Sequence, residues 1–338
     1  MATAVPCNIS SGSIFCNLTA NVKKGLRPSL FACIFSGIIG IPPNIIIIRA
    51  VYVNTLLRKP IYYFMANLAV CNLTQIMANI VNYIISNLFT KYLIPNHVQN
   101  ILCKIFAIFP YYWSYTTSVQ ALILVSYERH QAVCRPFKRF TLNKVKLLCI
   151  LAWIISLIIA LPYLITATSS RSELRICTPY QYNSIWIIIL NIITFLFQFA
   201  IPTTAMTIMH WLVLHRLTSK AIVTPQETAT NKLLKRQAIY MLTTTVIFVI
   251  FSMPSVMSSV AIIITGTISS HLNNVNGFPV LQIIVASSGF LLPFTTPCNP
   301  IIFCIFHPNL RHALFCRANH LPKTKRKDPV QVIQISAP

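Results

Sequence analysis

The stretch VSYERHQAVCRPF, Val125 to Phe137, places a carboxylate beside an arginine at the end of a long apolar run. The pair Glu128 and Arg129 is unusual because the chain has 27 Lys and Arg but only four Asp and Glu. A single charge at the edge of a membrane is costly, whereas adjacent opposite charges can share that cost. The meaning of the stretch therefore depends on the solvent around it.

The composition of the chain indicates a membrane protein. Hydrophobic residues make up 55% and charged residues 9% of the 338 positions, and the mean hydropathy is +0.68. Soluble domains carry about 25% charged residues. A formal charge of +23 would suggest nucleic acid in a soluble chain, but in a membrane protein basic residues follow the orientation of the loops. We expect lipid contacts and no nucleic-acid partner.

The apolar residues fall into seven stretches, each long enough to cross a bilayer as a helix, which takes about 20 residues. They show no alternating pattern of barrel strands, so helices are expected. Prolines interrupt several of them. The stretches run over Ser29–Tyr52, Ile61–Leu88, Ile101–Tyr127, Val145–Ile165, Ser184–Leu214, Ala238–Gly266 and Phe278–Ile305.

The basic residues predict the orientation. Of the Lys and Arg residues, 20 lie in segments on one side of the spans and seven on the other, and the richer side is expected to be cytoplasmic. The sequons at Asn8 and Asn17 agree with an extracellular N-terminus. The leader has no continuous apolar core, so we expect the first span to serve as the anchor.

The cysteines divide by compartment. Cys103 and Cys177 share the oxidising side and could form a bridge, and so could Cys7 and Cys16. Cys316 follows a basic stretch after the last span and could carry a palmitoyl group or a free thiol. Those within spans are expected to act as small hydrophobes: Cys33, Cys71, Cys149 and Cys298.

Several motifs occur in one order along the chain. Trp153 and Pro162 lie in the fourth span and Pro202 in the fifth. The quoted motifs are RKPIYYFMANLAVCNL (Arg58–Leu73), VSYERHQAVCRPF, FVIFSMP (Phe248–Pro254), NPIIF (Asn299–Phe303) and HPNLRHALFC (His307–Cys316). Together they resemble the signatures of rhodopsin-like (class A) G-protein-coupled receptors, including the Asp/Glu-Arg-Tyr and Asn-Pro-x-x-Tyr motifs.

The resemblance implies an all-α fold, a seven-transmembrane helix bundle with a short amphipathic eighth helix. It implies an extracellular tail over residues 1–28, a receptor domain over 29–306 and a cytoplasmic helix and basic tail over 307–338. It also favours the Cys103–Cys177 disulfide and a multi-pass location in the plasma membrane, with a cytoplasmic C-terminus. The receptor would have no cofactor, no metal site and no enzymatic activity.

By the same resemblance, Glu128 holds Arg129 in the inactive state, and activation releases the arginine toward a heterotrimeric G protein. Arg135, Lys138, Lys235 and Arg236 would line the opened groove. The other positions that match the family's switch motifs are His130, Pro254, Asn299, Pro300 and Phe303.

Some positions depart from the family pattern. Asn72 replaces an acid that helps to hold sodium, and an amide is a poorer ligand for a hard cation. Ser252 replaces a tryptophan and Phe303 a tyrosine, which removes a phenol donor. His130 and His210 also stand at tyrosine positions. In the first span Pro42, Pro43 and Asn44 stand where Gly-Asn is usual, and the interval from Cys103 to Arg129 is one residue longer than the family norm.

The ligand class follows from what the outer halves of the spans lack. Tyr111 falls where amine receptors carry an aspartate, and Pro293 falls where opsins carry a lysine. An uncharged, apolar or weakly polar small molecule is therefore expected, with a peptide or lipid as alternatives. The start of the second span, KPIYYF, also resembles that of chemosensory receptors. The expected lining is Tyr111, Tyr112, Tyr115, Thr194, Gln198 and Ser255.

Other classes of membrane protein fit less well. A membrane hydrolase needs clustered intramembrane His, Asp or Ser-His partners, and His210 is expected to stand alone near the inner face. A transporter would show repeated halves, and the sequence contains no such repeat. A receptor-like protein that does not couple, acting as a partner in heteromers, remains a second hypothesis because of Ser252 and Phe303.

Overall fold

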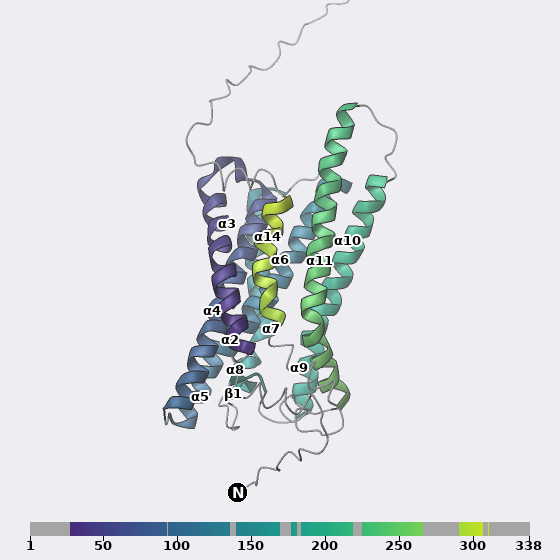
Figure 1. Cartoon of the computed structure of the whole chain (residues 1–338). Coiled ribbons are helices and arrows are strands. Elements are labelled where there is room, and N and C mark those ends of the chain that lie inside the picture. The colour runs from purple at the N-terminus through teal and green to yellow at the C-terminus, as the bar shows by residue number, and fades with distance from the viewer. Residues whose placement is uncertain are drawn as a thin grey trace, which may run out of the picture.

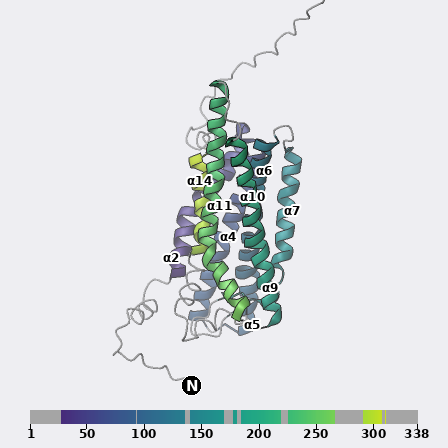
Figure 2. The same cartoon turned by 90° about the vertical axis from the view of Figure 1, so that its right-hand side faces the viewer.

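The computed structural model describes residues 28–92, 94–135, 140–169, 177–180, 184–218, 225–265, 291–306 and 310. In these residues seven helical columns stand side by side (Figures 1 and 2). A rhodopsin-like helical bundle was predicted, and the columns agree with it. The expected eighth helix lies outside the described residues.

Each column consists of one or more consecutive helices. Their bounds are α2 (Pro28–Phe35), η1 (Ser36–Gly40) and α3 (Ile41–Val53); α4 (Pro60–Lys91); α5 (Asn96–Leu102), η3 (Cys103–Ile108) and α6 (Phe109–Cys134); α7 (Leu142–Ala160) and α8 (Tyr163–Thr166); α9 (Ile185–Phe195), η4 (Leu196–Ala200) and α10 (Ile201–Thr218); α11 (Pro225–Thr265); and η5 (Leu292–Phe294) and α14 (Thr295–Phe306). A 3-10 turn, η2 (Thr55–Leu57), joins α3 to α4.

Local sequence signals explain where several helices begin. Pro60 opens α4, at a position where a missing backbone N–H is harmless. The side chain of Thr141 accepts a hydrogen bond from the backbone N–H of Lys144, and that of Ser184 accepts one from Trp186. These contacts satisfy backbone donors that the first turn of a helix leaves free.

Three columns contain a π-helical segment, and each segment ends two residues before a proline. η1 ends at Gly40 before Pro42, η3 at Ile108 before Pro110, and η4 at Ala200 before Pro202. Proline removes a backbone donor and clashes with the preceding turn, and a wider π turn relieves that clash. Because a π turn holds an additional residue, η3 also accounts for the long interval from Cys103 to Arg129.

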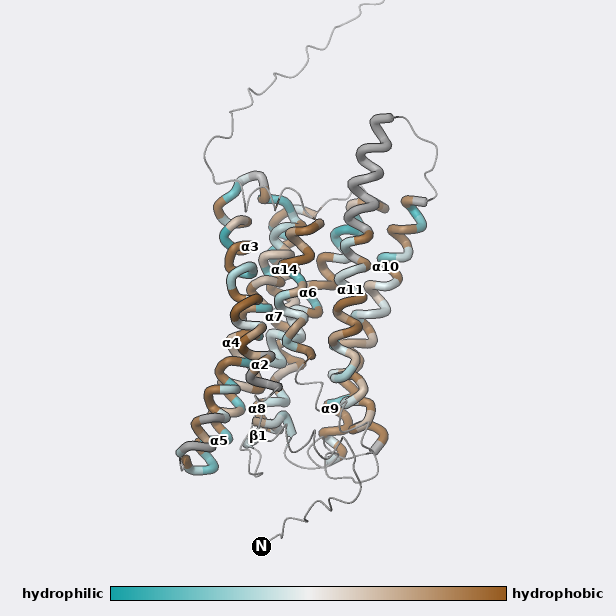
Figure 3. Tube along the Cα trace, in the orientation of Figure 1, coloured by the Kyte–Doolittle hydropathy of each residue, from teal (hydrophilic) through white to brown (hydrophobic). Residues whose placement is uncertain are grey.

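The burial pattern is that of a protein in lipid. Large apolar side chains such as Ile38, Ile158 and Trp186 point outward and are more than half exposed, and hydrophobic residues dominate most columns (Figure 3). Among the described residues, five helical stretches are individually long and apolar enough to span a membrane. α6 is not among them because many serine and threonine side chains lower its hydropathy; it is the helix that packs against α4, α7, α10 and α11.

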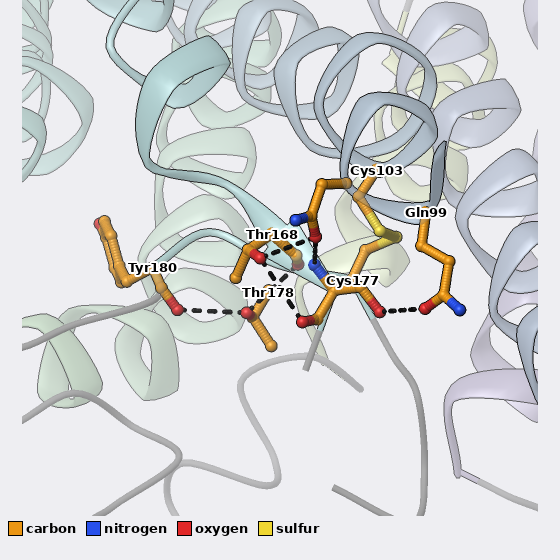
Figure 4. The surroundings of a disulfide bond; sticks show 8 residues. Gln99, Cys103, Thr168, Cys177, Thr178 and Tyr180 are labelled. Atoms are coloured by element: carbon orange, nitrogen blue, oxygen red, sulfur yellow. Dashed lines mark hydrogen bonds between the residues drawn. A yellow bond between two sulfur atoms is a disulfide. The ribbon is translucent and has the colours of Figure 1, made fainter. Parts of the chain in front are cut away.

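At one end of the bundle a short hairpin joins the helices. Strands β1 (Thr168–Ser169) and β2 (Cys177–Thr178) pair antiparallel. The Cys103–Cys177 disulfide ties this hairpin to η3, with the two Cα atoms 5.3 Å apart, as predicted (Figure 4). Asn100 of α5 accepts hydrogen bonds from the Thr168 hydroxyl and from the backbone N–H of Ser169.

The bounds differ from the sequence prediction mainly in the sixth column. α11 begins at Pro225, well before the predicted start at Ala238. The added turns carry polar residues, so a hydropathy criterion does not detect them. Only Leu291–Ile305 of the predicted seventh span lies within the described residues.

Candidate functional site

The opposite end of the bundle from the disulfide holds the Glu128–Arg129 pair, in the last two turns of α6. Arg129 donates from Nε to Glu128 Oε2 at 2.5 Å and from Nη2 to Oε1 at 2.9 Å. Both side chains are about nine-tenths buried. A bidentate arginine–carboxylate pair is among the stronger polar contacts in proteins, so the guanidinium is held rather than extended toward solvent.

Tyr240 of α11 is a neighbour of Arg129 that sequence reasoning missed. Its ring contacts Phe303 and Phe306 of α14, with centroid distances of 5.6 and 5.9 Å. Its phenol is within electrostatic reach of Arg129. A phenol is therefore present near the arginine. It comes from the sixth column, whereas the tyrosine position of the family motif in the seventh column is occupied by Phe303. The sequence signal that could have identified Tyr240 is its position as an aromatic residue at the inner end of the sixth predicted span.

His210 does not stand alone, contrary to the sequence-based expectation. Its Nε2 lies 3.3 Å from the Ser126 hydroxyl of α6, and its Nδ1 lies 3.5 Å from the Thr245 hydroxyl of α11. The ring is 4% exposed. The imidazole thus connects three columns through two hydroxyl groups.

Asn72 forms part of a neutral amide network in the middle of the bundle. It donates from Nδ2 to Asn44 Oδ1 at 3.2 Å, and Asn44 donates to the carbonyls of Gly40 and Thr296 at 2.7 and 3.4 Å. The prolines of the first span therefore leave Asn44 in a bridging position. Asn299 is buried one turn beyond Thr296.

Four of the six expected ligand residues lie near the centre of the bundle. Tyr111 and Tyr115 stack with centroids 6.5 Å apart, and the Tyr115 hydroxyl lies 3.4 Å from the Ser252 hydroxyl of α11. Gln198 of η4 donates to the Thr116 hydroxyl at 2.8 Å. Ser255 is half-buried one turn after Ser252.

The other two expected ligand residues adjoin an aromatic cluster under the hairpin. Tyr112 stacks on Tyr163 at 3.9 Å, and Tyr180, which follows β2, donates to Asn191 Oδ1 at 3.2 Å. Burial raises the pKa of Tyr180 to about 12. Thr194 bonds to carbonyls of its own helix, Leu190 and Asn191. The Tyr112 ring also meets the Tyr111 ring edge to face, with centroids 5.4 Å apart, so the cluster under the hairpin adjoins the central group.

The remaining residues predicted to belong to the switch and the groove have few described contacts. His130 is half-buried and Arg135 exposed at the end of α6, while Pro254 and Pro300 lie inside α11 and α14. No group of three metal-binding side chains occurs among the described residues. Asn8, Asn17, Cys7, Cys16, Lys138 and Cys316 lie outside the described residues, and so do the side chains of Lys235 and Arg236.

Comparison with known proteins decides the family. Residues 43–303 match the model of the seven-transmembrane receptors of the rhodopsin family. The chain belongs to this family. It is also similar to the muscarinic acetylcholine receptor M3 of Gallus gallus, with 29% identity over 176 residues, 50% of this chain. The match covers 26% of the length of that relative. The resemblance found in the motifs is confirmed, and the chain is a multi-pass membrane receptor-family protein.

Proposed function

We propose that this rhodopsin-family protein is a plasma-membrane receptor that relays binding of an uncharged extracellular ligand to a heterotrimeric G protein. The observation that carries the proposal is the buried, bidentate Glu128–Arg129 pair at one end of α6. Glu128 is the only acidic residue in a predicted span. The pair is a restraint that can be opened, because a charge-assisted bond is strong when closed and both partners are solvated when released.

The neighbouring columns support a two-state reading of the pair. Tyr240 of α11 lies within electrostatic reach of the buried Arg129 and packs its ring against Phe303 of α14. Outward movement of α11 would carry Tyr240 away from Arg129 and expose the guanidinium to a partner helix. Binding of a ligand in the outer half can drive this movement only if the ligand prefers the open state.

The proposed ligand is uncharged. Acetylcholine, in the name of the chicken relative, carries a permanent positive charge, whereas here the acidic residues are Glu128, Glu173, Glu227 and Asp328. None of them falls in the outer half of a span. The polar groups around Tyr115 and Gln198 are hydroxyls and amides, which suit a weakly polar small molecule. A peptide or lipid ligand, and a chemosensory role, are alternatives within the same proposal.

The test is ligand-free G-protein activation in transfected cells at matched surface expression. We expect Arg129→Ala to abolish coupling, and Arg49→Ala, an exposed arginine on α3 outside the groove, to leave it unchanged. If wild type, both variants and Glu128→Gln are silent with every G protein tried, the non-coupling heteromer hypothesis is favoured. The buried Phe303, which lacks a hydroxyl, is the observation behind that second candidate.

A further inference from the structure

His210 of α10 connects the third, fifth and sixth columns close to the Glu128–Arg129 pair. Its Nε2 lies 3.3 Å from the Ser126 hydroxyl of α6, and its Nδ1 lies 3.5 Å from the Thr245 hydroxyl of α11. Ser126 precedes Arg129 by three residues, so the two side chains lie on one side of α6. We call the Ser126–His210–Thr245 contacts the imidazole bridge.

The hydrogen bonds of the imidazole bridge fit a neutral ring. The Thr245 hydroxyl donates to Met206 Sδ at 3.8 Å, and a hydroxyl has one proton to donate. Thr245 therefore accepts from the Nδ1–H of His210. A neutral imidazole that carries its proton on Nδ1 accepts at Nε2, and the Ser126 hydroxyl is the donor there. Each polar atom of the ring is thus used once.

A second proton on this ring is unfavourable in the closed bundle. Nε2 would become a donor, so the Ser126 hydroxyl would have to turn round to accept from it. The charge would lie in a ring that is 4% exposed, and a buried charge without a partner is costly. Glu128, the acid two residues after Ser126, is already bonded by Arg129.

The other charged and titratable groups near the imidazole bridge lie on the same three packed helices. The Cys134 thiol faces α10, since it lies 3.9 Å from the Leu212 carbonyl. Apart from Glu128, these groups are cations or are neutral at about pH 7, so they offer no counter-charge to a protonated His210. Among the described residues they are Glu128, Arg129, His130 and Cys134 on α6, Tyr240 on α11, and the exposed His215 and Arg216 on α10 itself.

We propose that the imidazole bridge is a proton-sensitive latch that ties α11 to α6 and α10 in the resting receptor, and that protonation of His210 favours release of α11. The contact with Thr245, at 3.5 Å, is at the outer limit of hydrogen-bond length and is the one that opens. Release brings the ring into contact with water at the end of the bundle that is expected to be cytoplasmic. The inference rests on the proposed receptor function and adds a regulator of the same switch, the cytoplasmic proton.

The direction and size of the effect follow from proton linkage. An imidazole in water titrates at about pH 6.5. Because the proton binds to the released ring in preference to the buried one, release is favoured as the pH falls through that value and is unaffected well above it. From about pH 7.5 to about pH 6, the ratio of released to closed molecules should rise about fourfold.

The test measures the separation of α11 from α7 without a G protein. Nitroxide spin labels replace the exposed Lys144 of α7 and Ile239 of α11 in the full-length chain in lipid nanodiscs. They are attached through p-acetylphenylalanine, so the native cysteines stay in place. Pulsed electron resonance then gives the fraction of molecules with the longer distance at the two pH values. We expect the ratio of long to short distances in this parent chain to rise about fourfold at the lower pH.

Substitutions separate the latch from other effects of pH. His210→Asn retains an N–H for Thr245 but cannot be protonated, so the distance should stay short at both pH values. His210→Phe removes the bond and should raise the released fraction at both; Thr245→Val is the second variant if His210→Phe does not fold. His215→Asn changes an exposed histidine of the same helix and is the matched control, which should respond like the parent.

Two results would overturn the inference. The first is a distance distribution of the parent that does not change with pH. The second is a pH response that persists in His210→Asn, which would assign the proton uptake to another group, with Glu128 first among them. Neither result involves G-protein coupling, so the proposed function would stand. Conversely, a chain that fails to couple would still show the pH-dependent distance.

Discussion

At the scale of single residues, the positions that depart from the family motifs have acquired partners within this chain. Ser252, at a tryptophan position, lies fully buried against the Tyr115 hydroxyl. His210, at a tyrosine position, bridges Ser126 and Thr245. The smaller or differently shaped side chains thus gain local hydrogen bonds in place of the family's usual contacts.

The Tyr115–Ser252 contact gives a residue-scale prediction. Ser252→Ala should lower the free energy of unfolding by about 1–3 kcal/mol, because the buried Tyr115 hydroxyl loses its partner. Adding Tyr115→Phe should recover part of that loss, since both polar atoms are then absent. Thermal unfolding of the purified variants measures both effects, with Ser259→Ala, a half-buried serine on the same helix, as the control. Additive losses in the double variant would show that the two hydroxyls do not interact.

At the scale of elements, prolines and π segments occur together in the first, third and fifth columns. Hydropathy predicted the spans because a run of about 20 apolar residues is needed to cross lipid. It did not predict the π segments, which depend on how a proline's missing donor is accommodated by the preceding turn. The unusual interval between Cys103 and Arg129 was visible in the sequence, and the structure assigns the additional residue to η3.

This assignment predicts the effect of single-residue deletions. Deleting Phe106, an exposed residue of η3, should convert the π turn to an α turn and preserve the orientation of the helix on both sides. Deleting Leu124, within the regular part of α6, should rotate one flank by about 100° against the other and prevent folding. Surface expression and mapping of the Cys103–Cys177 bridge under non-reducing conditions report the outcome. Equal damage from both deletions would contradict the assignment.

At the scale of the whole molecule, the sequence was sufficient for the fold class, the family and the disulfide. The side-chain groupings were less predictable, because they depend on the rotation of each helix about its axis. Tyr111 and Tyr112 are adjacent in sequence and their rings meet edge to face, but Tyr111 stacks on Tyr115 and Tyr112 stacks on Tyr163. Tyr240 was missed for the same reason, since neither hydropathy nor a motif indicates which neighbour a ring contacts.

The predicted orientation of the molecule has a direct test. The uneven distribution of basic residues and the sequons at Asn8 and Asn17 predict an N-terminus outside the cell. Glycosidase treatment should shift the gel mobility of the wild type and leave the Asn8→Gln/Asn17→Gln variant unchanged. An epitope at Ala2 should stain intact cells. Staining only after permeabilisation would contradict the prediction and indicate a cytoplasmic N-terminus.

The central claim is that Glu128 restrains Arg129 in the resting receptor, and ligand-free G-protein activation of Glu128→Gln tests it most directly. Glutamine keeps the size of the side chain but removes the charge from a buried, bidentate pair. A charge-assisted bond contributes about 1.5–3 kcal/mol, so basal activity should rise about tenfold or more until the active state saturates. At matched surface expression, a basal activity of Glu128→Gln equal to that of an active wild type would contradict the claim.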